Sequence, residues 1–125
     1  MTLKNKLYTI ADRQHEGEMT RFSLNLNAAH EIYGAHFPGE PVTPGVCLVQ
    51  MAGELLEECL GRKMQLKKAV NVKFLSPVSP VITPSVHFAV TPAPADAEGL
   101  IRSSVRVEYE SRVMAKMSLI HSPAV

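Results

Sequence analysis

His36-Phe37-Pro38-Gly39-Glu40-Pro41-Val42-Thr43-Pro44-Gly45 is the stretch from which the fold of this chain can be worked out. Its three prolines and two glycines predict a stiff, turn-rich loop, because proline fixes φ and glycine favours turns. Thr43 is a suitable N-cap for a following helix, and Pro44 suits the first helical position, where a missing N–H leaves nothing unpaired. Gly61 is suited to end that helix. The sequence therefore predicts a loop that leads directly into a helix.

Apolar side chains cover most of the circumference of this expected helix. One row along it is made by Val46, Val49, Leu56 and Leu60. A second row is made by Leu48, Ala52, Leu55 and Cys59. Such a helix is buried on most of its sides. The exception is a narrow stripe at one angular position, made by Cys47, Gln50, Glu54 and Glu57. That stripe is where the helix would meet substrate, solvent or another subunit.

Alternation of apolar and polar side chains predicts strands before and after the helix. The first covers Thr20–Asn27, and the later ones are the segments 70–74, 86–90, 101–109 and 113–119. Residues 28–43 show no periodicity and predict a long loop. Glu110-Ser111 predicts a hairpin between the last two strands. A nearly apolar helix and strands with one apolar face each bury their surfaces most simply if an antiparallel sheet wraps around the helix, which is an α+β fold.

Length and composition limit the kind of protein. With 125 residues, 46% of them hydrophobic, the chain suits one domain over residues 1–125 with a real core. A net charge of +1 gives no field that would favour nucleic acid or a membrane surface, which leaves small-molecule or protein partners. The chain has no apolar run of the ~18 residues that a membrane span needs and no secretion signal between Met1 and Ile10. We therefore expect a cytoplasmic protein.

The loop and the helix start resemble a known signature. His36-Phe37-Pro38-Gly39, Pro41-Val42 and Pro44-Gly45-Val46 match, at fixed spacing, hotdog-fold beta-hydroxyacyl-ACP dehydratases of fatty acid synthesis. Weaker similarity extends over residues 27–78. The resemblance implies a hotdog fold that dimerises by joining sheets edge to edge, or forms a higher homo-oligomer, with sites at the subunit interface. It also implies dehydration, or the reverse hydration, of a 3-hydroxyacyl thioester carried on acyl carrier protein (ACP) or CoA, and it implies no cofactor and no metal.

The same resemblance assigns roles to the residues of the signature. His36 would be the base that removes the α-proton, which suits a side chain that titrates near neutral pH. The backbone N–H groups of Gly45 and Val46 would hydrogen-bond the thioester carbonyl as it gains negative charge, which is the usual use of a helix N-terminus. The neighbouring loop residues would bind substrate beside the histidine; they are Phe37, Pro38 and Gly39.

The chain departs from the resembled family at the second catalytic group. The family's helix acid, contributed by the neighbouring subunit, falls on Gln50, and its common glutamine one turn later falls on Glu54. An amide cannot supply a proton at neutral pH, so three outcomes are open. Glu54 acts as the acid directly or through a water held by Gln50, which we favour because the His36 loop is intact. Alternatively, Glu54 activates a water in an acyl thioesterase, or the chain is a non-catalytic acyl-binding subunit of a hetero-oligomeric dehydratase.

The remaining candidate residues carry weaker signals. His15, His30, His87 and His121 are expected at the surface or in loops, and they show no metal-ligand spacing. Cys47 and Cys59 would lie about 18 Å apart along the helix, too far to pair, and are expected to be reduced core residues. Basic side chains that could receive an acidic carrier protein fall into two groups. They are Arg62, Lys63, Lys67 and Lys68 after the helix, and Arg102 and Arg106 on a strand.

Overall fold

A computed structural model describes residues 2–124. Within these residues, six strands and two helices follow one another. They are β1 (Tyr8–Glu16), β2 (Met19–Leu26), α1 (Glu31–Ala35), α2 (Gly45–Leu60), β3 (Met64–Phe74), β4 (Ser85–Pro92), β5 (Ile101–Tyr109) and β6 (Arg112–Pro123). No helix among these residues is both long enough and apolar enough to span a membrane.

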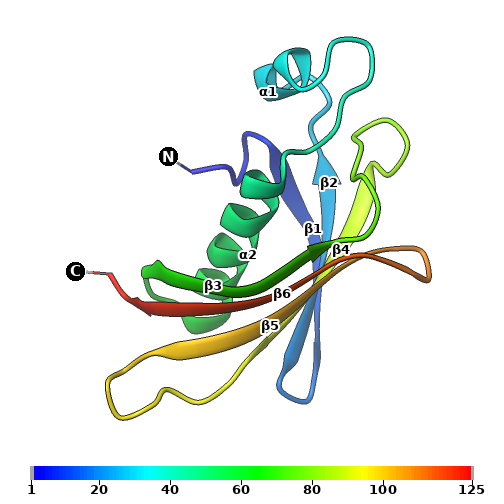
Figure 1. Ribbon diagram of the computed structural model, residues 1–125. Coiled ribbons are helices and arrows are strands. Elements are labelled where there is room, and N and C mark those ends of the chain that lie inside the picture. The colour runs from blue at the N-terminus through cyan, green and yellow to red at the C-terminus, as the bar shows by residue number, and fades with distance from the viewer. Residues whose placement is uncertain (1, 125) are drawn as a thin grey trace.

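The strands form one antiparallel sheet in the order β1-β2-β4-β5-β6-β3. The sheet curls around α2, while α1 and its loop lie beyond the start of that helix (Figure 1). The expected hairpin is confirmed, because Tyr109 of β5 pairs with Arg112 of β6 across Glu110-Ser111. β1 and β3 form the two edges of the sheet. The α+β architecture expected from the sequence, a sheet wrapped around one long helix, is therefore confirmed.

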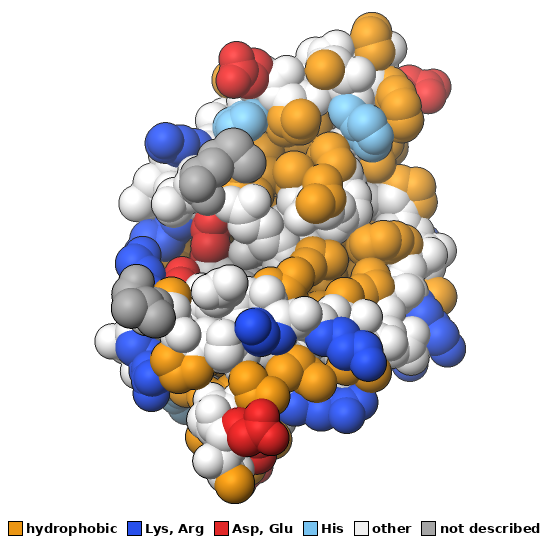
Figure 2. Space-filling model, turned by 60° about the vertical axis from the view of Figure 1, so that its left-hand side comes forward, with side chains coloured by type: hydrophobic (Ala, Val, Ile, Leu, Met, Phe, Trp, Pro, Cys, Tyr) orange, Lys and Arg blue, Asp and Glu red, His pale blue; other side chains and the backbone are white. Residues whose placement is uncertain are grey.

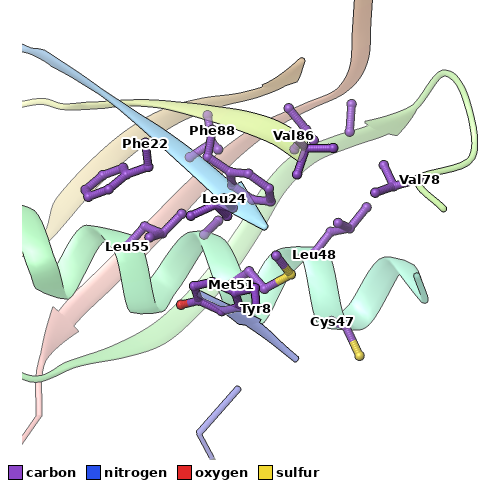
Figure 3. Packing of buried hydrophobic residues seen from close by; sticks show 14 of the residues in the cluster. Tyr8, Phe22, Leu24, Cys47, Leu48, Met51, Leu55, Val78, Val86 and Phe88 are labelled. Carbon is purple, nitrogen blue, oxygen red and sulfur yellow. The ribbon is translucent and has the colours of Figure 1, made fainter. Parts of the chain in front are cut away.

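The core lies between the concave face of the sheet and α2. Figure 3 shows Leu55 near Leu24 and Phe22 of β2, Met51 beside Tyr8 of β1, and Leu48 below Val86 of β4. Met51 and Leu55 are fully buried, as are Phe88 of β4 and, almost completely, Phe22 of β2. Burying one such side chain contributes about 1.5 to 3 kcal/mol. The helix position is thus fixed by packing along most of its length.

The start of α2 differs by one residue from the sequence prediction. Pro44 is the cap residue and Gly45 the first helical one, and no side chain of the described residues caps the helix. Thr43 is not the N-cap, because its hydroxyl is buried against the Tyr33 hydroxyl at 2.8 Å. The end is as expected: Gly61 adopts φ 67° and donates its N–H to the Glu57 carbonyl.

Two residues of the first turn of α2 differ from the buried row and the polar stripe that the sequence predicts. Val46 was expected in a buried row, but 76% of its surface is exposed. Cys47 is buried, which agrees with its prediction as a core residue and removes it from the predicted polar stripe. Val46 thus lies on the exposed side of the first turn, whereas Cys47 belongs to the core cluster. Cys47 and the half-buried Cys59 are both free thiols, as expected.

The strand predictions were incomplete at three places. β1 precedes the predicted first strand, and its largely exposed polar side chains hide the alternation. The segment 28–43 is not all loop, because α1 interrupts it. β3 begins at Met64, and three of its apolar residues are exposed, Leu66 by 44%, Val70 by 37% and Phe74 by 53%. An edge strand has a neighbour on one side only, which leaves these side chains uncovered.

Candidate active site

His36 is held inside its own loop. Its backbone N–H donates to the Ile32 carbonyl at 2.9 Å, its carbonyl accepts from the Val42 N–H at 3.0 Å, and its ring stacks on Phe37 with centroids 4.0 Å apart. Ring atom Nδ1 lies 3.2 Å from the Val42 carbonyl oxygen. A carbonyl only accepts, so Nδ1 carries a proton in this contact, and in the neutral ring the lone pair is therefore on Nε2. The loop therefore fixes both the position and the tautomer that a general base needs.

The start of α2 offers two unpaired donors. Cys47 and Leu48 donate their N–H groups to the Pro44 carbonyl, whereas no acceptor within residues 2–124 serves the N–H groups of Gly45 and Val46. These groups carry the positive end of the helix dipole. The ring of Phe74 lies directly against Gly45, where an added Cβ would come within 2.5 Å of Phe74 Cζ. A larger residue at position 45 would have to displace the Phe74 ring from this contact.

The carboxylate of Glu54 accepts four hydrogen bonds. Oε1 accepts from the Lys4 N–H at 2.9 Å and the Tyr8 hydroxyl at 2.8 Å. Oε2 accepts from the Leu3 N–H at 2.7 Å and from Gln50 Nε2 at 3.1 Å. Burial and the hydrogen bond to this carboxylate raise the pKa of Tyr8 well above its ordinary value, so the phenol stays protonated and donates. Glu54 thus joins the N-terminal segment to α2 and contacts Gln50.

Gln50 and Glu54 border a cavity of about 510 Å³ beside α2. The cavity lies between the helix, the N-terminal segment and the adjoining ends of β3 and β6, and its other lining residues include Val49, Met64 and His121. His36 is not among the described residues that line it. The structure therefore brings Gln50 and Glu54 together within one chain and leaves His36 in a separate loop beyond the start of α2 (Figure 1).

The other histidines lie in varied surroundings. His15 is exposed, as expected. His30 is half-buried and caps α1 through Nδ1, which accepts from the Ile32 N–H. His87 is half-buried on β4 with its Nδ1 3.0 Å from the Ser23 hydroxyl. His121 was expected at the surface or in a loop, but it is 3% exposed on β6, because Gly53 of α2 leaves space for its ring. Burial lowers its pKa.

The described residues include no group of three His, Cys, Asp or Glu side chains placed to hold a metal ion. The exposed face of the sheet instead carries a row of cations. Arg106 of β5 lies opposite Lys116 of β6, which in turn lies opposite Lys73 of β3. All three are exposed, and Arg106 Nε donates to Glu108 at 3.1 Å. We call Lys73, Arg106 and Lys116 the basic row.

A model of the ApeI-like family, described as ApeI dehydratase, matches residues 12–108. The chain belongs to the ApeI-like dehydratase family. It is also 30% identical to the 3-hydroxyacyl-[acyl-carrier-protein] dehydratase FabZ of Fusobacterium nucleatum, over 57% of this chain and 54% of that enzyme. The match thus spans about half the length of this curated relative. Membership of a dehydratase family supports a hydratase or dehydratase role and agrees with the resemblance seen in the His36 loop.

Solved structures show the fold. The dehydratase heterocomplex ApeI:P from Xenorhabdus doucetiae superposes with a TM-score of 0.68 at 15% identity, over 90% of this chain and 96% of that one. The (R)-hydratase from A. caviae involved in PHA biosynthesis gives 0.64 at 13% identity, over 89% and 98%. An HP0420 homologue from Helicobacter felis gives 0.68 at 12% identity, over 99% and 93%. The expected hotdog fold is confirmed.

Sequence reasoning missed the N-terminal half of the site. Leu3, Lys4 and Tyr8 contact Glu54 across 46 to 51 positions in the chain, and no local pattern announces such contacts. The one available signal was the apolar pair Leu7-Tyr8 ahead of a polar stretch. His121 was missed for a similar reason, since its burial depends on the absence of a side chain at Gly53.

Proposed function

We propose that this protein removes water from a 3-hydroxyacyl thioester to give the trans-2-enoyl thioester, or catalyses the reverse hydration. The observation that carries the proposal is the fixed tautomer of His36. Its Nδ1–H donates to the Val42 carbonyl, which leaves the lone pair of Nε2 in the neutral ring to act as the base. A proton next to a thioester is weakly acidic, so its removal benefits from such a base.

The steps follow from the groups on this chain. His36 Nε2 takes the α-proton, and the electron pair of that C–H bond forms the new double bond as the C–O bond at the β-carbon breaks. The N–H groups of Gly45 and Val46 bind the thioester oxygen as it gains enolate charge. Gln50 hydrogen-bonds the leaving hydroxyl. Protonated His36 then gives this proton to the departing hydroxyl, so that the proton from the α-carbon and the hydroxyl from the β-carbon leave together as water and the base is restored.

We propose that the complete site forms between two subunits. β3 is an edge strand whose apolar side chains Leu66, Val70 and Phe74 are exposed. Orange side chains are exposed across the middle of the face shown in Figure 2. Pairing β3 with β3 of a second copy would cover exposed apolar side chains and would give hydrogen-bond partners to the unpaired backbone groups of the edge strand. It would also bring a second α2 near the His36 loop, which the chain by itself does not provide.

Two other functions are less well supported by the geometry. A thioesterase would need Glu54 as a base for water, but each oxygen of that carboxylate already accepts from two donors.

The second alternative is a subunit of a hetero-oligomeric dehydratase whose partner subunit supplies the acid. The presence of Gln50 where the resembled family has an acid favours it, and a solved relative in fold is a dehydratase heterocomplex.

We further propose that the acyl group arrives on an acidic carrier protein that docks on the basic row. Like charges directly opposite one another in a sheet destabilise it, yet the basic row sets Arg106, Lys116 and Lys73 side by side. An acidic partner would offset that repulsion. The cations that follow the helix, Arg62 and Lys63, are the alternative docking surface.

We also propose a cytoplasmic location, because two free cysteines suit a reducing compartment.

The proposal is tested with a panel of 3-hydroxyacyl-ACP and 3-hydroxyacyl-CoA thioesters. Enoyl product and released thiol are measured in the same reactions. We expect enoyl product from the wild type and a loss of about 10² to 10⁴ in rate for His36→Ala. His15→Ala is the matched control, because this exposed histidine lies outside the site, and its rate should equal that of the wild type. Thiol release that survives His36→Ala would instead establish a thioesterase.

A further inference from the structure

We propose that Glu54 is a positioning residue that fixes the amide of Gln50 for the substrate hydroxyl, and that the N-terminal segment, residues 2–8, holds Glu54 for this task. The inference rests on the proposed dehydratase function. It assigns Glu54 a role other than general acid, and it makes a segment outside the His36 signature part of the catalytic apparatus.

The first argument is the saturation of the carboxylate. An ionised carboxylate offers about four acceptor positions, and four donors occupy Glu54 at 2.7 to 3.1 Å. Three of them come from the N-terminal segment and one is Gln50 Nε2. With its acceptor positions filled, the carboxylate has little capacity to bind a catalytic water. Two of the four donors, Gln50 and Lys4, line the cavity. Lys4 donates through its backbone, so the side-chain group that Glu54 orients beside the cavity is the Gln50 amide.

The second argument is that the donors are rigid. Leu3 is 2% exposed, and Leu7 and Tyr8 are fully buried, so the segment is anchored in the core independently of Glu54. Two backbone N–H groups and a buried phenol therefore hold the carboxylate from fixed positions. A functional side chain is oriented best when its support is itself locked by packing. The segment supplies that support to α2.

The third argument concerns the amide. A carboxylate only accepts, so the atom of Gln50 that faces Glu54 Oε2 is the nitrogen. This contact fixes which edge of the amide is Nε2 and which is Oε1. Without this contact, the glutamine side chain would lose its rotamer freedom only when substrate binds, and that ordering costs free energy. The substrate hydroxyl therefore meets an amide whose orientation is set before binding, and the loss of that order should lower kcat more than it raises KM.

The experiment compares Glu54→Gln with Glu58→Gln. Glu58 lies one turn further along α2 and binds the same N-terminal segment through Lys4 Nζ at 2.7 Å, and it also binds Arg13, with no bond to Gln50. Both variants change contacts to the segment or its neighbours. Only Glu54→Gln changes the group that accepts from the Gln50 amide, because one of its two oxygens becomes an NH₂ donor while four donors still face the side chain. We expect Glu54→Gln to lower kcat by about 10 to 100-fold with a smaller change in KM, and Glu58→Gln to keep the wild-type kcat.

A double-mutant cycle separates positioning from general damage. Gln50→Leu removes the amide, so adding Glu54→Gln to it should leave kcat unchanged. If Glu54→Gln does not fold, Tyr8→Phe replaces it, since it removes one donor to Glu54 and keeps the buried ring; its smaller loss in kcat should likewise vanish with Gln50→Leu. An active wild type with equal kcat for Glu54→Gln and Glu58→Gln, or with losses that persist in the Gln50→Leu background, overturns the inference and leaves the dehydratase proposal intact. A wild type without enoyl product refutes that proposal and, with it, this inference.

Discussion

Gln50→Glu is the substitution with the most informative expected outcome. It replaces the Gln50 Nε2 donor, 3.1 Å from Glu54 Oε2, with a carboxyl oxygen, so that two carboxyl groups share one site. At that separation two negative charges repel by about 1 kcal/mol in a water-like medium and about 5 kcal/mol at an effective dielectric constant near 20. The pair therefore loses its second proton at a pH about 1 to 4 units higher than it would without the repulsion.

The proton should stay on the introduced side chain. Glu54 would still accept from Leu3, Lys4 and Tyr8, so the introduced carboxyl is the partner that has to donate in the contact with Glu54 Oε2. The variant would therefore carry a carboxylic acid beside the cavity. A general acid contributes about 10² to 10⁴ in rate, so we expect faster enoyl formation than in the wild type at acidic and neutral pH. The gain should disappear as the pH rises and the shared proton leaves.

The assay is the initial rate of enoyl formation from one 3-hydroxyacyl thioester between acidic and alkaline pH. The wild type should show one ionisation, and Gln50→Glu a bell-shaped profile. The control is the exchange Gln50→Glu with Glu54→Gln, which removes the repulsion and should move the alkaline limb to lower pH. A variant no faster than the wild type at every pH would refute the reasoning, because the acid would then be supplied from elsewhere.

Three further outcomes concern the fold and the assembly. Leu55→Ala, at a fully buried position, should lower the free energy of unfolding by about 2 to 5 kcal/mol in urea titrations, and unchanged stability would contradict the core assigned to α2. Burial lowers the pKa of His121 from its ordinary 6.5, so the unfolded chain binds the proton first and stability should fall as the pH drops below about 6.5; His121→Leu should flatten this dependence, and an equal slope in both proteins would exclude His121 as its source. Val70→Lys on the exposed face of β3 should convert a dimer into monomers in analytical ultracentrifugation, and a dimer that persists would place the interface elsewhere.

Local patterns in the sequence determined much of this protein. The loop chemistry of residues 36–45, the apolar circumference of the helix and the ending at Gly61 indicated a buried central helix, and alternation indicated most of the sheet around it. These features are local because helix and strand periodicity depend on neighbouring residues. The signature around His36 also indicated the dehydratase family, since it is a contiguous run.

Tertiary structure alone decided which groups the polar stripe of the helix contacts. Sequence reasoning could note Gln50 and Glu54 one turn apart, but the partners of Glu54 are Leu3, Lys4 and Tyr8, which reach it only when the chain folds back. The exposure of Val46 and the burial of His121 likewise depend on where the sheet stops and on the space at Gly53. Hydrogen-bond saturation is a property of three-dimensional surroundings, so the sequence could identify a carboxylate beside the site, and only the folded chain showed that its acceptor positions are filled.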